Sequence, residues 1–149
     1  MSQYGTYPDA YYRVSLKAVI KNAHGEVLCV TEGSDLWELP GGGIDHGEDV
    51  QTALARELKE EIDYSGTFTY LISDTVTLYD KPNERCMMLI GFDVTLDEAY
   101  EIRRGGDDNV REVAWIDPHT LSDEDARGTR VIYRFAVDHS HIVDFERTN

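Results

Sequence analysis

Apolar and polar residues alternate along the first strongly patterned segment of the chain, from Tyr11 to Lys21. Every second position is apolar: Val14, Leu16, Ala18 and Ile20. Such alternation predicts a strand with one face in the core. Turn-forming residues follow from Asn22 to Gly25, and the segment from Glu26 to Glu32 is again rich in apolar residues. We therefore predict a second strand that pairs with the first as a hairpin.

The spacing of apolar residues becomes helical from about Glu48. Apolar residues then recur at every fourth position: Val50, Leu54, Leu58 and Ile62. This spacing predicts a helix with one buried stripe. Asp49 lies near the predicted start, where its charge would interact favourably with the positive end of the helix dipole.

The second half of the chain is rich in strand-forming residues. Two long segments, Thr67 to Tyr79 and Arg85 to Leu96, flank the turn residues Lys81 to Glu84 and predict a second hairpin. We expect a polar loop, a short strand and a helix after it: Asp97 to Asn109, Val113 to Ile116, and part of Arg130 to Phe145. This order of elements favours an α+β fold with a mixed sheet over a regular βαβ array.

Three glutamates of the predicted helix would share one side of it. Glu57, Glu60 and Glu61 stand at i, i+3 and i+4, so they would lie a few ångström apart. Their like charges repel by about 0.2 to 0.5 kcal/mol per pair. A divalent cation would turn this cost into a binding site, and oxygen ligands suit hard ions such as Mg2+ or Mn2+. We therefore predict that this helix holds a metal ion.

A proline and three glycines precede the helix. The stretch from Trp37 to Gly43 reads WELPGGG, which excludes a regular helix there. Bare glycine backbone also permits the close approach of a ligand or an ion. A flexible turn is the alternative interpretation.

The segment from Gly42 to Tyr64 reads GGIDHGEDVQTALARELKEEIDY and resembles the signature of the Nudix hydrolase family, G-x5-E-x7-R-E-U-x-E-E-x-G-U, where U is apolar. The matching positions are Gly42, Glu48, Arg56, Glu57, Leu58, Glu60, Glu61 and Tyr64. Asp63 replaces the second glycine of the signature, so the exit of the helix departs from the family pattern. Asp tolerates the left-handed conformation of a helix C-cap better than most residues other than glycine.

The resemblance implies an α/β/α sandwich with a mixed sheet. We expect residues 1–149 to form one domain in which residues 1–10 are a flexible segment. The resemblance also implies an enzyme in which Mg2+, or alternatively Mn2+, assists the attack of water on phosphorus. Such enzymes cut a nucleoside diphosphate linked to another moiety within its phosphoanhydride. By position, Glu57, Glu60 and Glu61 would hold the metal ion together with the Gly41 carbonyl, and Glu57 is also the candidate general base.

Arg56 also belongs to the catalytic set that the resemblance implies. We expect its guanidinium to pair with Glu48 or Glu61 and to order the loop, rather than to contact the substrate. Glu48 would then support the metal ligands without binding the ion itself.

A general base or additional metal ligand lies outside the signature in several family members. The candidates in this chain are Asp107, Asp108 and Glu112, which precede Trp115. The alternative is that these residues are solvated charges of a loop.

Aromatic and basic residues outside the signature are candidates for substrate binding. Trp37 and Tyr79 could stack on a nucleobase, and Arg13 and Arg85 could contact phosphate. The competing interpretation is that aromatic residues in strands serve packing.

The chain of 149 residues has a formal net charge of −15. Nucleic acids are bound through Lys and Arg, so this charge disfavours a long nucleic acid as partner, a decapping role included. A small phosphorylated metabolite, such as a nucleotide, remains compatible if metal ions supply the neutralising charge. No stretch approaches the roughly 20 apolar residues that span a bilayer, and the first residues lack the layout of a signal peptide. We therefore expect a cytoplasmic protein without a membrane partner.

A nucleoside triphosphate is the substrate that we prefer. ADP-ribose, nucleotide sugars and dinucleoside polyphosphates stay open as alternatives. In the family, a Tyr or a Pro at a set distance beyond the signature distinguishes subgroups with different substrates. This chain has both Tyr79 and Pro82 in that range, so neither subgroup is favoured. A non-catalytic Nudix-like domain that senses nucleotides or binds proteins is the alternative from another class. The presence of all three helix glutamates favours the enzyme. The sequence leaves the oligomeric state undetermined, with a homodimer as one option.

Overall fold

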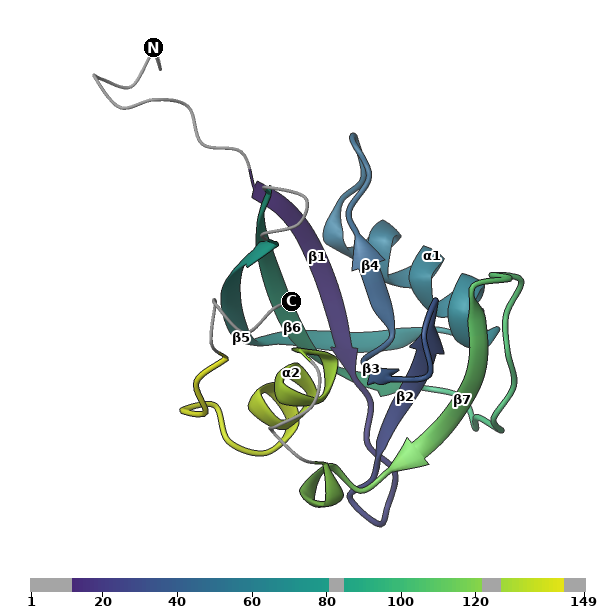
Figure 1. The fold of residues 1–149 in the computed structure, drawn as a ribbon. Helices are drawn as coiled ribbons and strands as arrows, with labels where there is room; N and C mark the ends of the chain where they lie inside the picture. Colours follow the sequence, from purple (N-terminus) through teal and green to yellow (C-terminus); the bar gives the residue numbers. More distant parts are fainter. Residues whose placement is uncertain (1–11, 81–84, 122–126, 144–149) are drawn as a thin grey trace.

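The computed structural model describes residues 12–80, 85–121 and 127–143. Its strands form two sheets (Figure 1), one in the order β4-β1-β6-β5 and the other in the order β3-β2-β7. The strands are β1 (Tyr12–Val19), β2 (Val27–Glu32), β3 (Trp37–Glu38), β4 (Gly41–Gly43), β5 (Phe68–Asp80), β6 (Arg85–Leu96) and β7 (Val110–Ile116). The helices are α1 (Val50–Ile62) and α2 (Arg127–Ala136), and Pro118–Thr120 forms a 3-10 helix. The N-terminal segment 1–10 and the turn 81–84 lie outside the described residues.

Strands β1, β2 and β6 supply side chains to two separate cores, because successive strand residues point to opposite faces. One core contains α1 and these strand residues: Leu16, Ala18, Leu28, Val30, Phe92 and Val94. The other core contains α2 and these strand residues: Val19, Val27, Cys29, Met87 and Leu89. The two helices therefore cover opposite faces of the strands. Since β1 runs parallel to β6 and antiparallel to β4, the predicted α/β/α sandwich with a mixed sheet is confirmed.

The predicted hairpin of the first two strands is wrong. Strand β1 pairs with β4 and β6, whereas β2 pairs with β3 and β7 in the other sheet. Next to the turn, the two segments share an isolated bridge between Lys21 and Val27. Hydrophobic alternation in the first strand correctly identified Leu16, Ala18 and Ile20 as core residues, but it contains no information on which strand becomes the neighbour.

The second hairpin is confirmed, since β5 and β6 pair from Phe68–Leu96 to Asp80–Arg85 with one register shift between Ile72 and Asp74. The segment 97–109 is an irregular loop, as predicted. Strand β7 is longer than predicted and begins at Val110. None of the helices in the described ranges is long and apolar enough to cross a membrane.

Helix α1 has a defined cap at each end. Asp49 is the N-cap, and its Oδ1 accepts a hydrogen bond from the Thr52 N–H at 2.8 Å. Asp63 is the C-cap in the left-handed conformation, with a φ of 53°, and its N–H donates to the Leu58 carbonyl. The Lys59 ammonium donates to Asp63 Oδ1 at 2.6 Å. Asp63 therefore fulfils the conformational role that the signature gives to glycine.

The loop between β6 and β7 caps the last turn of α1. Carbonyl groups at the end of a helix have no partner within the helix, and here the loop supplies donors for them. The bonds are Asp107 N–H to Glu60 O at 2.9 Å, Gly105 N–H to Glu61 O at 3.1 Å, and Tyr100 O–H to Ile62 O at 3.0 Å. A side chain at Gly105 would lie 2.2 Å from the Glu60 carbonyl oxygen. The loop is thus anchored to the part of the helix that carries the predicted metal ligands.

Substitution of Asp63 tests how much strain the helix exit stores. Ala and Gly both remove the bonds of the side chain, but a left-handed conformation costs an ordinary L-residue about 1 to 2 kcal/mol. Asp63→Gly should therefore be more stable than Asp63→Ala by about 1 kcal/mol, as measured by urea denaturation. An Asp63→Ala variant that is as stable as Asp63→Gly would contradict the assignment of strain to this residue.

Candidate active site

Two glycines let strand β4 run close to its neighbours. A side-chain carbon at Gly41 would lie 1.9 Å from the Leu16 carbonyl oxygen, and one at Gly42 would lie 2.5 Å from Glu57 Oε1. Gly41 also has a φ of 135°, which favours glycine. The close approach predicted for this stretch is thus made by groups of the protein itself, and it brings a glutamate of α1 against the β4 backbone.

Two of the three glutamates predicted to bind the metal are buried at the junction of α1 and β4. The exposed fractions of Glu57 and Glu61 are 8% and 1%. The Gly41 N–H donates to both carboxylate oxygens of Glu61 at 3.3 Å. Burial raises the pKa of Glu61 well above its ordinary value, although the positive charge of Lys17 opposes the shift. The Glu60 side chain differs, since it is 47% exposed.

Arg56 ties helix α1 to the loop that precedes it. Its Nε and Nη2 donate to the two carboxylate oxygens of Glu48, both at 2.8 Å, and Nη2 also donates to the Gly43 carbonyl at 3.1 Å. Its Nη1 donates to Glu57 Oε1 at 2.9 Å and to Glu60 Oε2 at 3.3 Å. The predicted pairing with Glu48 is therefore confirmed, and one oxygen of Glu57 is held by the same guanidinium.

Glu48 is a firmly ionised anchor for Arg56. Its Oε1 also accepts a hydrogen bond from the Asp45 N–H at 2.8 Å. The hydrogen bonds from Arg56, followed by the bond from the Asp45 backbone, lower the pKa of Glu48 to about 2. The carboxylate therefore stays charged at any pH near neutrality and keeps the bidentate pair intact.

Three charged residues that the sequence analysis missed lie near the buried glutamates. They are Lys17 on β1, Glu32 at the end of β2 and Glu38 on β3. Burial raises the pKa of Glu32, Lys17 lowers it, and the negative charges of Asp107, Glu38 and Glu57 raise it further. The site is therefore an acidic group drawn from two sheets and a helix, with one lysine among the carboxylates.

A signal for Glu32 was present in the sequence. Leu28, Val30 and Glu32 occupy alternate positions of β2, and the first two are fully buried. A carboxylate that continues the buried face of a strand requires a compensating partner. Lys17 gave a weaker signal, because its strand neighbours Leu16 and Ala18 face the core and it lies on the other side.

The structure separates the three candidates for a base outside the signature. Asp107 is half-buried and lies close enough to Glu32 to raise the pKa of that carboxyl. Asp108 is exposed. Glu112 is exposed too and lines a pocket beside Trp37 and several arginines. Asp107 is thus the candidate that the fold brings to the acidic group.

The four candidates for substrate binding have different surroundings. Arg13 donates to the Ile44 carbonyl at 2.8 Å and so holds the loop after β4. Trp37 is half-buried on β3. Tyr79 lies near the end of β5, opposite Cys86. Arg85 begins β6, but its side chain lies outside the described part of the chain.

The donor chemistry of the site fits a hard divalent cation. Among residues 12–80, 85–121 and 127–143, no three His, Cys, Asp or Glu side chains are arranged to hold a metal ion. Arg56 engages Glu57 and Glu60, while the Gly41 N–H engages Glu61. Mg2+ and Mn2+ take oxygen ligands, and two carboxylates buried side by side favour a cation between them. To hold such an ion together with the Gly41 carbonyl, the carboxylates of Glu57, Glu60 and Glu61 would have to turn from these donors toward it.

A small cavity of about 80 Å³ adjoins the acidic group. Lys17 and Glu38 line it together with the apolar side chains of Met87 and Leu89 and with Arg127 from α2. The cavity therefore presents both apolar and cationic groups next to the carboxylates.

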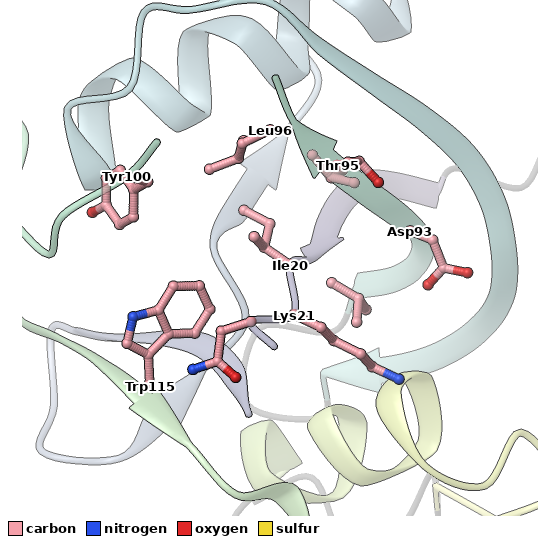
Figure 2. Close-up of a pocket in the computed structure, with 10 residues that line it drawn as sticks. Ile20, Lys21, Asp93, Thr95, Leu96, Tyr100 and Trp115 are labelled. Atoms are coloured by element: carbon pink, nitrogen blue, oxygen red, sulfur yellow. The ribbon is translucent and has the colours of Figure 1, made fainter. Parts of the chain in front are cut away.

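A larger cavity has a volume of about 430 Å³ (Figure 2), and Ile20, Leu96, Tyr100 and Trp115 are among its lining residues. None of the predicted metal ligands lines it. The Tyr100 hydroxyl at its wall is already bonded to backbone groups, the Ile62 carbonyl among them. We therefore place the chemistry at the carboxylates and not in this cavity.

Comparison with known proteins identifies relatives over most of the chain. A family model described as a NUDIX domain matches residues 11–135. An ADP-ribose pyrophosphatase of Saccharomyces cerevisiae is 35% identical over 92 residues, which cover 58% of this chain and 38% of that protein. An RNA pyrophosphohydrolase of Novosphingobium aromaticivorans is 29% identical over 146 residues, which cover 85% of this chain and 91% of that protein. The chain thus spans well under half of the yeast relative and most of the bacterial one.

Solved structures with the same fold are also found. A MutT NUDIX hydrolase from Burkholderia pseudomallei has a TM-score of 0.70 at 22% identity, covering 85% of this chain and 99% of that chain. The dihydroneopterin triphosphate pyrophosphohydrolase of E. coli has a TM-score of 0.64 at 21% identity, covering 87% and 99%. At these identities the likeness concerns the fold alone.

The lowered pKa of Glu48 predicts a specific loss of stability in acid. A glutamate of the unfolded chain has a pKa of about 4.3, so the stabilisation by the Arg56–Glu48 pair is complete above about pH 5 and is lost as the pH falls towards about 2. Glu48→Gln should lower the free energy of unfolding near neutral pH, and its difference from the wild type should shrink at lower pH. Chemical denaturation at several pH values measures this difference.

Asp93→Asn is the matched control for this experiment, since Asp93 is an exposed carboxylate on β6. Its effect on the free energy of unfolding should be small. If the difference in the free energy of unfolding between Glu48→Gln and the wild type stays constant from neutral pH into acid, the Arg56–Glu48 pair does not stabilise the fold.

Proposed function

Because the chain belongs to the Nudix domain family, we propose that it is a metal-dependent pyrophosphohydrolase that cuts a phosphoanhydride of a nucleotide-linked substrate. The observation that carries this proposal is the burial of Glu57 and Glu61 one helical turn apart. Two neighbouring carboxylates out of water are unfavourable without a cation. A site of this kind is suited to bind a divalent ion and, through it, a phosphate chain.

Mg2+, or Mn2+ in its place, would neutralise phosphate oxygens and lower the pKa of a bound water molecule. The residues of the chain provide the remaining functions. Glu57, Glu60 and Glu61 are the proposed ligands, and the Gly41 carbonyl is the proposed backbone ligand. Arg56 fixes the orientation of Glu57 through the bond from Nη1 to Oε1 at 2.9 Å.

Glu57 Oε2 is the proposed proton acceptor for the attacking water, because Arg56 bonds the other oxygen of this carboxylate. Asp107 is the second candidate, since it is half-buried beside Glu32. Lys17 supplies the positive charge among these carboxylates. We propose that its ammonium group offsets negative charge on the phosphate chain as the bond breaks.

We propose a nucleoside triphosphate as the substrate. The small cavity beside the carboxylates combines apolar side chains, Met87 and Leu89, with the cationic groups of Lys17 and Arg127. At about 80 Å³ the cavity would contact only one edge of an organic ring system attached to phosphates. Inorganic polyphosphate has no apolar group that could contact Met87 and Leu89.

Two other nucleotide-linked substrates are supported by the names of the relatives. The yeast relative is named an ADP-ribose pyrophosphatase, which makes ADP-ribose the second candidate. The bacterial relative, which matches over most of its length, is named an RNA pyrophosphohydrolase. The net charge of −15 counts against a long RNA in this chain.

Replacing one buried carboxylate should abolish most of the activity. We expect the wild type to hydrolyse nucleoside triphosphates with Mg2+ or Mn2+ and to lose this activity in EDTA. Glu57→Gln and Glu61→Gln should each lower kcat/KM by about a hundredfold or more, since a metal ion contributes several kcal/mol of charge stabilisation. A screen that includes nucleotide sugars, ADP-ribose and dinucleoside polyphosphates, with products identified by mass, measures substrate choice and position of cleavage.

Glu26→Gln is the matched control, because this glutamate accepts a bond from Asn22 in the turn after β1 and does not belong to the acidic group. It should leave kcat/KM unchanged. If the wild type binds nucleotides saturably but hydrolyses none of them with any divalent metal, the chain is a non-catalytic sensing domain and not an enzyme.

A further inference from the structure

The loop 97–109 between β6 and β7 carries Asp107, the second candidate for the proton acceptor of the proposed reaction. Arg103 lies four residues earlier on the same loop, and its guanidinium is bonded to Asp63 at the end of α1. We infer that Arg103 is a positioning residue, which fastens the loop to this helix end and so holds Asp107 beside the acidic group. The inference rests on the proposed function and adds to it the residue that orders one of its proton acceptors.

The guanidinium of Arg103 joins the helix exit to two other residues of the loop. Its Nε and Nη2 both donate to the Asp63 carbonyl, at 3.2 and 3.0 Å, and Nε also donates to Asp63 Oδ2 at 3.3 Å. Its Nη1 donates to the Glu101 carbonyl at 3.1 Å. The guanidinium also lies over the ring of Tyr100, 5.2 Å from the ring centroid, which adds a cation–π contact. This set of contacts depends on the planar fork of an arginine.

Asp63 supplies more than the conformation that the family signature obtains from glycine. A glycine at this position would allow the left-handed exit of the helix, but it has no carboxylate. Asp63 Oδ1 accepts a hydrogen bond from the Lys59 ammonium at 2.6 Å, and Oδ2 accepts one from Arg103 Nε at 3.3 Å. The departure of this chain from the signature therefore adds an attachment point for the loop.

The segment between Arg103 and Asp107 lies directly against the backbone of α1. The Gly105 N–H donates to the Glu61 carbonyl at 3.1 Å, and the Asp107 N–H donates to the Glu60 carbonyl at 2.9 Å. A side-chain carbon at Gly105 would lie 2.2 Å from the Glu60 carbonyl oxygen. A displacement of Arg103 from the helix end therefore disturbs the contacts that place Asp107.

The position of Asp107 matters because its carboxylate lies near other charges of the site. Its Oδ1 accepts a hydrogen bond from the Asn109 N–H at 2.9 Å, and no residue in the described ranges donates to its Oδ2. The Asn109 carbonyl accepts a bond from the N–H of Gly33, the residue after Glu32. The negative charge of Asp107 also raises the pKa of Glu32. Oδ2 can therefore accept a proton at the acidic group as long as the loop stays in place.

Amide hydrogen exchange tests whether Arg103 holds the loop, without any dependence on turnover. Arg103→Gln removes the fork from a side chain that is 45% exposed, so it takes no group from the core. The amides of Gly105 and Asp107 should then exchange about fivefold faster or more, since the loss of one hydrogen bond shifts a local opening equilibrium by about this factor. Asp63→Gly keeps the bonds to the backbone carbonyl and should cause a smaller increase.

Lys59→Gln is the matched control for the exchange measurement. It removes the other cation that binds the Asp63 carboxylate, but this cation belongs to the helix and not to the loop. Exchange at Gly105 and Asp107 should keep its wild-type rate. Unchanged exchange in Arg103→Gln, or an equal increase in Lys59→Gln, would overturn the inference.

Steady-state kinetics test whether the effect of Arg103 passes through Asp107. For a nucleotide that the wild type cleaves, Asp107→Asn should lower kcat about tenfold or more and Arg103→Gln about threefold or more, both with little change in KM. The double variant should be no slower than Asp107→Asn alone, because the two residues act in one chain of contacts. Gly105→Ala displaces the loop by steric contact with α1 and should behave as Arg103→Gln does.

The kinetic outcomes separate this inference from the proposed function. Additive free-energy losses in the double variant, or a wild-type kcat in Asp107→Asn, would overturn the positioning role of Arg103 while hydrolysis stands. If the wild type cleaves no nucleotide, the proposed function fails, and the exchange measurement still decides whether Arg103 fixes the loop.

Discussion

The burial of two glutamate carboxylates against a glycine strand is the constraint on which the site depends. Removing an ionised carboxylate from water costs several kcal/mol, and Glu57 and Glu61 are both nearly inaccessible. The buried stripe of α1 holds the helix against the strands, and the absence of a side chain at Gly42 leaves room for Glu57. Packing energy of the helix thus maintains an arrangement of charges that would be unfavourable by itself.

Several segments cooperate to keep this arrangement in place. The Arg56–Glu48 pair fixes the loop before the helix, and the loop after β6 bonds the carbonyls of the last helical turn. Lys17 from β1 places a positive charge among the carboxylates. Each of these contacts comes from a different part of the chain, so the charged group forms only when the two sheets and the helix are assembled.

The sequence predicted the parts of the site that are local in the chain. The four-residue spacing of Val50, Leu54, Leu58 and Ile62 predicted the helix and its buried face, and the structure places all four in or against one core. The C-cap role of Asp63 and the pairing of Arg56 with Glu48 were also predictable, because both depend on residues within one signature. Glu60 was placed correctly on the helix, but its exposure depends on how the helix meets β4, which spacing alone does not determine.

The contributions from distant strands were harder to predict. Alternation identified a buried face of β1 but not the separation of β1 and β2 into two sheets, because pairing depends on partners far away in the chain. For the same reason Lys17 and Glu38 could not be connected to the helix glutamates beforehand. Glu32 is the exception, since its position after Leu28 and Val30 on a buried face marked it as a charge in need of a partner.

The central claim is that Glu57 and Glu61 hold a divalent cation. The most direct measurement is the anomalous scattering of Mn2+ in crystals of the protein, grown with the ion and with a non-hydrolysable nucleoside triphosphate analogue. A manganese peak within about 2.2 Å of carboxylate oxygens of both residues is the predicted result. Well-ordered side chains with no peak between them, or metal bound only at surface carboxylates, would contradict it.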